Sequence, residues 1–167
     1  MLDIAQTMST SLDTKTTLQQ IVDSITQVTG LDSGAIYTLT GNQLYLATTA
    51  PALPPEMPDQ FRFANLADHP HIQITLAKGS SVIIPDTEVA ELTEAEREIC
   101  ITRGLRSIAY LPLMSARTAI GVLIVASTKK LRTFTDEELL LYHGFSVQAA
   151  QTIENAQLYD SIRVHSN

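Results

Sequence analysis

The side chains that could carry chemistry in this chain of 167 residues are few and far apart. Its single cysteine, Cys100, has Arg97 and Arg103 three residues away on either side. Neighbouring cations favour the reactive thiolate when the sulfur is accessible. However, a lone cysteine on a short amphipathic helix is usually a small core residue. We therefore expect Cys100 to be structural, and a small thiol-dependent reductase is the remote alternative.

The histidines and the familiar catalytic motifs give no further site. His69 and His71 flank Pro70 without a His-Glu-x-x-His pattern or a third ligand nearby, so we expect them to be surface residues. The sequence contains no Gly-rich phosphate loop ending in Gly-Lys-Ser or Gly-Lys-Thr, no Gly-x-Gly-x-x-Gly turn and no Gly-x-Ser-x-Gly elbow. The domain itself is predicted not to be an enzyme, and we expect no metal and no cofactor.

Charge and hydropathy limit the kinds of partner. The formal net charge is -7, which disfavours binding to nucleic acid or to an anionic membrane surface. One cysteine cannot form an internal disulfide, and the N-terminus lacks the basic and apolar segments of a signal peptide. The longest apolar run, Ala119–Ala126, is too short to span a bilayer. We expect a cytoplasmic domain with no nucleic-acid partner and no membrane partner.

The elements that position these residues begin with two predicted N-terminal helices. A weak amphipathic pattern covers residues 2–12, and Asp13 has the N-cap chemistry for a second helix that ends at Gly30. The whole chain, 1–167, is predicted to be one domain, divided into the N-terminal helices (1–30), the sheet with its short helices (31–132) and a C-terminal signalling helix (133–165).

The middle of the chain alternates between strand and helix signals. Gly41 and Asn42 join two apolar runs in a hairpin pattern, and four prolines in residues 50–60 indicate a loop. Thr93 and Glu96 form a capping box at the start of a short helix. Strands are expected near residues 35–39, 44–48, 61–63, 82–84, 104–113 and 119–126. Because strands occur both before and after helices, the predicted fold class is α+β with an antiparallel sheet.

The C-terminal helix has strong start signals and two apolar faces. Thr135 and Glu138 form a second capping box, and Phe134 and Leu139 are placed for a hydrophobic staple beside it. The apolar residues fall on different sides of the helix, with Phe145, Ala149, Ile153 and Ala156 on one and Leu140, Val147 and Leu158 on the other. One face can cover the sheet, and we expect the other to pair with a second copy of the chain. A helix buried inside a monomer is the alternative.

The order of elements in Gly104–Asn155 is the most specific feature of the sequence. A Leu-Pro-Leu strand, a turn, an Ile-Gly-Val-Leu strand, a loop, Phe-Thr-Asp-Glu-Glu and a long helix follow one another. This order resembles the C-terminal half of GAF domains, which are small-molecule sensing and dimerising modules. The resemblance implies a central antiparallel sheet of about six strands, with the terminal helices on one face and short helices over a ligand pocket on the other. Gly121 matches a glycine of the family and suits a close approach of two backbones.

The resemblance also implies a function. The chain is expected to be a regulatory domain of a multidomain signalling protein, most often a two-component sensor histidine kinase. It would bind an unknown small molecule, form a homodimer through its terminal helices and relay a signal to a downstream output domain. The expected pocket wall consists of Phe61, Phe63, Asp86, Cys100, Arg106, Ser107 and Tyr110. Asp86 and Arg106 are the polar residues expected to orient the ligand.

A module without a ligand is the main alternative. Its pocket would be filled by aromatic side chains of the chain itself, namely Tyr37, Tyr45, Phe61, Phe63 and Tyr110. A bilin is not expected, because Ile101 stands where bilin-binding members of the family carry a histidine after the cysteine. A haem is not expected, because neither His69 nor His71 has a clear structural reason to face a cavity. A cyclic nucleotide is not expected either, because the Asn of that signature is missing before Phe134 and the acidic pair after it is differently spaced.

Overall fold

The computed structural model describes residues 4–53 and 62–165 of the chain. Their order is α1 (Ile4–Thr29), β1 (Ser33–Thr40), β2 (Gln43–Ala50), β3 (Phe63–Asn65), η2 (Leu66–Asp68), α2 (Pro70–Lys78), β4 (Val82–Ile84), α3 (Glu94–Arg103), β5 (Leu105–Ser115), β6 (Thr118–Thr128) and α4 (Asp136–His165). The six strands form one antiparallel sheet in the order β3-β2-β1-β6-β5-β4. The predicted α+β class and sheet are confirmed.

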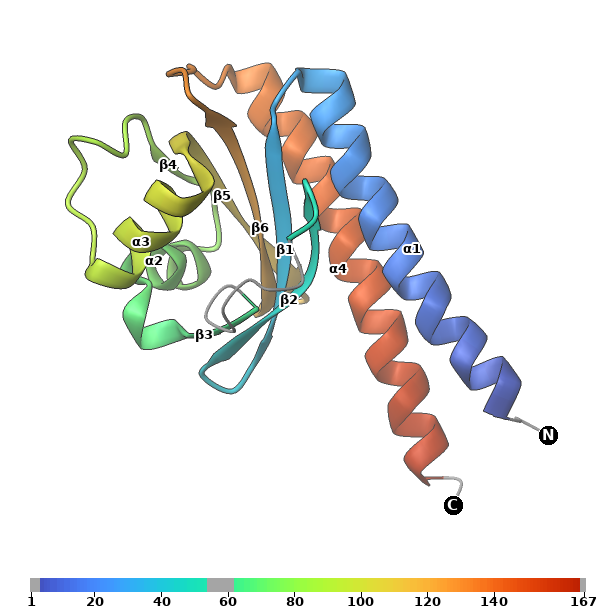
Figure 1. Ribbon diagram of the computed structural model, residues 1–167. Helices are drawn as coiled ribbons and strands as arrows, with labels where there is room; N and C mark the ends of the chain where they lie inside the picture. Colours follow the sequence, from blue (N-terminus) through green and yellow to red (C-terminus); the bar gives the residue numbers. More distant parts are fainter. Residues whose placement is uncertain (1–3, 54–61, 166–167) are drawn as a thin grey trace.

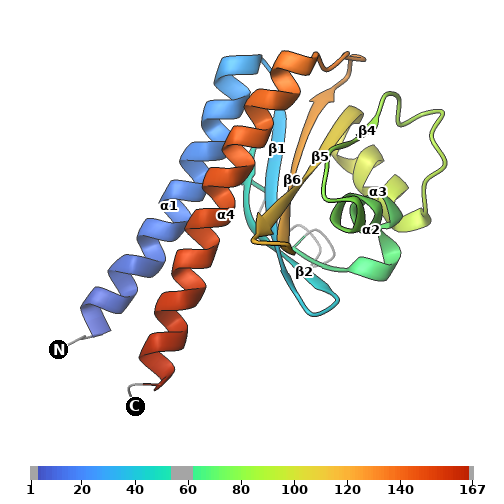
Figure 2. The same ribbon diagram turned by 180° about the vertical axis from the view of Figure 1, so that it is seen from behind.

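The sheet separates two layers of helices (Figure 1). The long helices α1 and α4 run antiparallel to each other along one face, and α2 and α3 cover the other (Figure 2). The ends of α1 and α4 that carry the chain termini project beyond the sheet in both views. This is the layer arrangement that the resemblance implied.

The central strands supply both cores by simple alternation, since successive side chains of a strand point to opposite faces. On β5, Ala109, Leu111 and Leu113 belong to the core under α1 and α4, whereas Ile108 and Tyr110 belong to the core under α2 and α3. These central strands are therefore buried on both faces, which explains their nearly continuous apolar sequence.

The helix signals were correct in the middle and at the end of the chain, and partly wrong at its start. Both capping boxes form. Thr93 and Glu96 make the expected reciprocal hydrogen bonds at the start of α3, and Thr135 and Glu138 make them at the start of α4. The prediction of two N-terminal helices is wrong, because α1 is continuous from Ile4 to Thr29. Between those residues there is no Gly or Pro to interrupt the helix, so the N-cap chemistry of Asp13 is not used for a new start.

The exposures along α4 confirm its two apolar faces. Tyr142, Ala149 and Ile153 are buried against the sheet and α1. On the opposite side, Leu140 is 72% exposed and Leu158 59% exposed. Within the described residues, no helix has the length and apolar character needed to cross a membrane. The second face of α4 is thus an apolar surface without a partner in the described single chain.

Candidate functional site

A small cavity lies between the sheet and the helices α2 and α3. Its volume is about 50 Å³, enough for a few water molecules, since one water needs roughly 10–15 Å³ measured in this way. The described residues that line it come from both layers: Ser33, Ala35, Tyr37, Leu44, Ala64, His69, Ile72, Glu96, Ile99, Cys100, Arg103, Leu105, Ile108, Tyr110, Ile124 and Ala126. Most of this wall is apolar, with a few polar groups placed in it, as is typical of a small-molecule site.

Glu96 joins the two helices that cover the cavity. Its side chain is only 4% exposed, and its Oε2 atom lies 2.8 Å from Nδ1 of His71 on α2. The same oxygen accepts a hydrogen bond from the backbone N–H of His71 at 3.2 Å, and Oε1 accepts one from the backbone N–H of Thr93 at 3.1 Å. The capping box of α3 therefore also fixes the start of α2, and the acceptors of Glu96 are engaged within the protein.

Arg103 brings a positive charge to the cavity from the last turn of α3. Its Nη2 atom donates to Oγ1 of Thr49 on β2 at 2.9 Å. Burial lowers the pKa of Arg103, and the charge interaction with Tyr37 acts in the opposite direction. Burial likewise raises the pKa of the Tyr37 phenol, although Arg103 partly offsets this. Arg103 thus ties α3 to the sheet while its guanidinium remains a wall of the cavity.

His69 and Tyr110 are polar side chains that the fold buries beside the cavity. They are 7% and 6% exposed. Neither the imidazole of His69 nor the hydroxyl of Tyr110 has a hydrogen-bond partner among the described residues, and the Tyr110 ring stacks on His71 with centroids 6.1 Å apart. Burial raises the pKa of Tyr110 well above its ordinary value. Hydrogen-bonding groups left open at a cavity wall are suited to meet a ligand or ordered water.

Cys100 is a buried structural residue, as its sequence context predicted. It is 6% exposed and lines the cavity. Burial, followed by the charge of Glu96, raises the pKa of the thiol to about 11 despite the opposing effect of Arg97. The thiol is therefore protonated at neutral pH and is a poor nucleophile.

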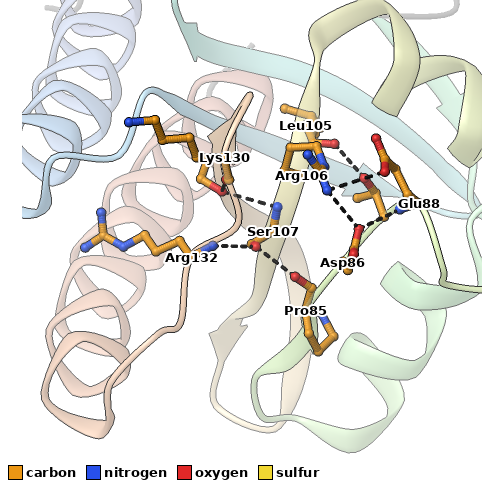
Figure 3. Close-up of polar contacts among 10 residues, drawn as sticks. Pro85, Asp86, Glu88, Leu105, Arg106, Ser107, Lys130 and Arg132 are labelled. Atoms are coloured by element: carbon orange, nitrogen blue, oxygen red, sulfur yellow. Dashed lines mark hydrogen bonds and ion pairs between the residues drawn. The ribbon is translucent and has the colours of Figure 1, made fainter.

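Three predicted pocket residues lie together outside the cavity, next to the start of β5 (Figure 3). Asp86 and Arg106 form an ion pair with 3.4 Å between Oδ1 and Nη2, and Arg106 also lies 3.5 Å from Glu88. The Ser107 hydroxyl donates to the carbonyl of Pro85 at 2.8 Å and accepts the backbone N–H of Arg132 at 2.9 Å. These contacts hold the loops before α3 and α4 against β5. Asp86, Arg106 and Ser107 therefore have a structural role at their positions outside the cavity.

The remaining predicted pocket residues divide between the cavity and the surface. Cys100 and Tyr110 line the cavity. Phe63 lies on the edge strand β3, is 51% exposed and packs edge-on against Tyr45 with centroids 5.5 Å apart. Phe61 lies outside the described residues. Among the described aromatic residues that were expected to fill a pocket, only Tyr37 and Tyr110 line the cavity.

Sequence reasoning missed three wall residues, and it was wrong about one of them. His69 was expected at the surface but is buried at the cavity, because it precedes the first turn of α2 where that helix meets α3. Glu96 was recognised only as a cap, and Arg103 only as a neighbour of Cys100. A usable signal exists for Arg103: it lies three residues after Cys100 and seven after Glu96, which places all three on one side of α3.

The buried imidazole of His69 predicts a pH-dependent loss of stability. Burial lowers the pKa of His69, and Glu96 and Asp68 only partly oppose this. Below the ordinary histidine pKa of about 6.5, the unfolded chain binds a proton that the folded chain does not, so stability falls as the pH is lowered through that value. We expect a His69→Gln variant to lose less stability than the original protein between about pH 7 and pH 5. Urea unfolding at each pH measures this, with His143→Gln, at an exposed position, as the control. An equal pH dependence in the original protein and His69→Gln would contradict the prediction.

Comparison with known families gives a match over most of the chain. Residues 13–153 match the family model described as GAF domain. Comparison with curated protein sequences gave no significant match.

Several solved structures similar to this chain are described as GAF domains. The GAF domain/HD domain protein from Geobacter sulfurreducens is 19% identical with a TM-score of 0.75, covering 87% of this chain and 95% of that one. The blue-light absorbing form of the PixJ GAF domain from Thermosynechococcus elongatus is 15% identical with a TM-score of 0.73, covering 94% of each chain. A domain of a putative two-component sensor histidine kinase from Sinorhizobium meliloti 1021 is 13% identical with a TM-score of 0.64, covering 86% of this chain and 92% of that one. At these identities the likeness concerns the fold.

Proposed function

The chain belongs to the GAF domain family, and on that premise we propose that it is a regulatory domain that senses a small molecule for a larger signalling protein. The parent is of the two-component sensor histidine kinase type, and one of the similar structures comes from a protein described in that way. The domain acts in the cytoplasm, forms a homodimer through α1 and α4, and is not itself an enzyme. Membership of the family is shown, whereas the signalling role, the ligand and the parent protein are the proposal.

The cavity wall carries this proposal. A core that only had to be stable would be filled by side chains, and its buried polar groups would be paired. Here the side chains of His69 and Tyr110 are more than nine-tenths buried and open onto a cavity without a partner among the described residues. The guanidinium of Arg103 lies in the same wall. Open polar groups in an otherwise apolar cavity are the features that orient a small ligand.

A variant that fills the cavity tests whether ligand binding drives signalling. Ala126 is 1% exposed and lines the cavity, so Ala126→Val adds two methyl groups to the space a ligand would occupy. Native mass spectrometry of protein purified from its own host is expected to show extra mass on the original domain and none on Ala126→Val. The parent protein carrying Ala126→Val is expected to lose its response to the signal while its domain stays folded by circular dichroism. A full response in the filled variant would contradict sensing through this cavity.

The long helix α4 is proposed to carry the signal, which makes its helical phase important. One extra residue rotates everything after it by about 100° about the helix axis. Inserting one alanine after Gln157, beyond the buried residue Ile153, is therefore expected to change kinase output in the parent without changing ligand binding. Autophosphorylation assays and calorimetry measure the two quantities. An insertion of seven residues, which nearly restores the helical phase, is the control and is expected to change output less. Unaltered output after the single insertion would mean that α4 only connects the two domains and does not carry the signal.

A domain without a ligand is the second candidate, favoured by the size of the cavity. About 50 Å³ is small beside the roughly 300–1,000 Å³ of sites for drug-sized ligands. In that case the domain is a dimerising relay, and Ala126→Val leaves both output and stability close to those of the original protein. The remote third candidate, a thiol-dependent reductase, is disfavoured by the raised pKa of Cys100, which is about 11.

A further inference from the structure

Arg103 is a charged wall residue without a counter-ion among the described residues. Arg103 lines the cavity and is partly buried. No described carboxylate oxygen lies within 4.0 Å of it. Its one hydrogen bond to a described residue goes to the neutral hydroxyl of Thr49, although a guanidinium has five N–H donors. A cation held away from water is costly unless an anion accompanies it.

The other ionisable groups of the cavity cannot supply that anion. Glu96 is already bound to His71 at 2.8 Å and to two backbone N–H groups. Burial holds the pKa of His69 below its ordinary value, so this imidazole is neutral at pH 7. The phenols of Tyr37 and Tyr110 have raised pKa values and are neutral too. Among the described residues, no carboxylate of the cavity wall therefore forms an ion pair with Arg103.

The other residues of the cavity wall indicate which kind of molecule would fit beside Arg103. Ile72, Ile99 and Ile124 line the cavity and suit a hydrocarbon chain. The Tyr110 hydroxyl, on a side chain 6% exposed, lies beside them and has no hydrogen-bond partner among the described residues. A volume of about 50 Å³ equals three to five water sites at roughly 10–15 Å³ each, so the ligand has about three to five non-hydrogen atoms.

We propose that the cavity binds a short-chain monocarboxylate, with its carboxylate on Arg103 and its hydrocarbon chain among the isoleucines. The planar fork of Arg103 can hold both carboxylate oxygens at once, whereas a lysine offers only a point charge. This inference rests on the proposed sensing function, because it names the ligand class of the same cavity. Nucleotides and tetrapyrroles are several times larger than the space available.

Sodium propionate is the probe for this proposal, tested by isothermal titration calorimetry on the whole chain at concentrations up to about 10 mM. Propionamide has the same shape without the charge, and propylamine carries the opposite charge. We expect saturable binding of propionate, at least about tenfold weaker binding of propionamide, and no binding of propylamine. Thermal shift against sodium chloride of equal ionic strength is expected to give the same order.

Two substitutions assign the carboxylate to Arg103. Arg103→Gln keeps a donor for Thr49 but removes the charge, and it is expected to weaken propionate binding at least about tenfold. Arg103→Lys keeps the charge without the fork and is expected to bind with intermediate strength. Arg97→Gln, at an exposed position of the same helix, is expected to stay within about twofold of the original protein. Circular dichroism checks that each variant is folded.

The outcomes separate this inference from the proposed function. Equal binding of propionate and propionamide, or unchanged propionate binding by folded Arg103→Gln, would overturn the carboxylate assignment. So would native mass spectrometry that finds a neutral or cationic molecule in the cavity, and that result would leave the sensing function standing. The sensing function itself fails on a different result, a full signalling response by the filled variant Ala126→Val.

Discussion

Alanine in place of Gly121 is expected to leave little folded protein. Gly121 lies on β6 between two partners, opposite Thr38 on β1 and Leu113 on β5. A Cβ atom added at this position would lie 2.4 Å from the carbonyl oxygen of Tyr37 and 3.1 Å from Cδ1 of Leu113. The first of these neighbours is backbone in the middle of the sheet, so β1 and β6 would have to separate.

We expect Gly121→Ala to destabilise the domain by more than about 3 kcal/mol, at or above the usual cost of overpacking a core. That is a large part of the 5–15 kcal/mol by which domains are commonly stable. Urea unfolding followed by circular dichroism measures it, or soluble yield if the variant does not fold. The matched control is Gly144→Ala on α4, where an added Cβ meets nothing within 4 Å and a helical alanine gains about 0.5–1 kcal/mol over glycine. Equal stability of the two variants would contradict this reading of the sheet.

Gly121 also illustrates what could be predicted from the sequence. Its place in the Ile-Gly-Val-Leu run indicated a close approach of backbones, and the structure identifies the approaching atom as the Tyr37 carbonyl oxygen. Caps and alternating strands are local patterns, so a short window of residues contains the information. The continuous helix α1 was missed because Asp13 offers a cap, and a cap residue says only that a helix can start there.

The candidate site was harder to predict, because its members come from separate elements. Asp86 and Arg106 were expected in the pocket on the grounds of charge, yet they form an ion pair with each other outside the cavity. His69 was assigned to the surface, because histidines beside a proline give no periodic signal of burial. Glu96 and Arg103 were both noted in the sequence, but their place in the cavity wall depends on how α2 and α3 pack against the sheet. Tertiary packing decides that, and no window of sequence contains it.

A glutamate in place of Leu140 is expected to convert the domain from dimer to monomer. Leu140, Val147 and Leu158 are 72%, 44% and 59% exposed, and spacings of 7 and 11 residues place them along one line of α4. In the last turn of the antiparallel partner helix α1, Val28 is 67% exposed. Contiguous apolar surface of this kind is typical of an interface, and a second copy of the chain presents the same stripe for a two-fold contact.

The expected effect of Leu140→Glu is a rise in the dimer dissociation constant of at least about 100-fold, since a two-fold interface suffers the change twice. Sedimentation velocity over a dilution series measures it. The monomer should stay folded, because substitutions at exposed positions usually cost less than about 0.5 kcal/mol. This separates the interface from the alternative of a core helix, in which the same change would unfold the domain.

Ile101→Glu is the matched control for that experiment. Ile101 is also 72% exposed, but it belongs to α3 on the other side of the sheet (Figure 1). It therefore carries the same change of charge and apolar area away from the stripe, and it is expected to leave the dimer intact. A monomeric original protein at tens of micromolar, roughly the range in which a modest interface associates, would contradict the dimer. Dissociation by Ile101→Glu but not by Leu140→Glu would move the interface to the face of α2 and α3. Ligand binding and dimerisation would then both involve α2 and α3 instead of lying on opposite faces of the sheet.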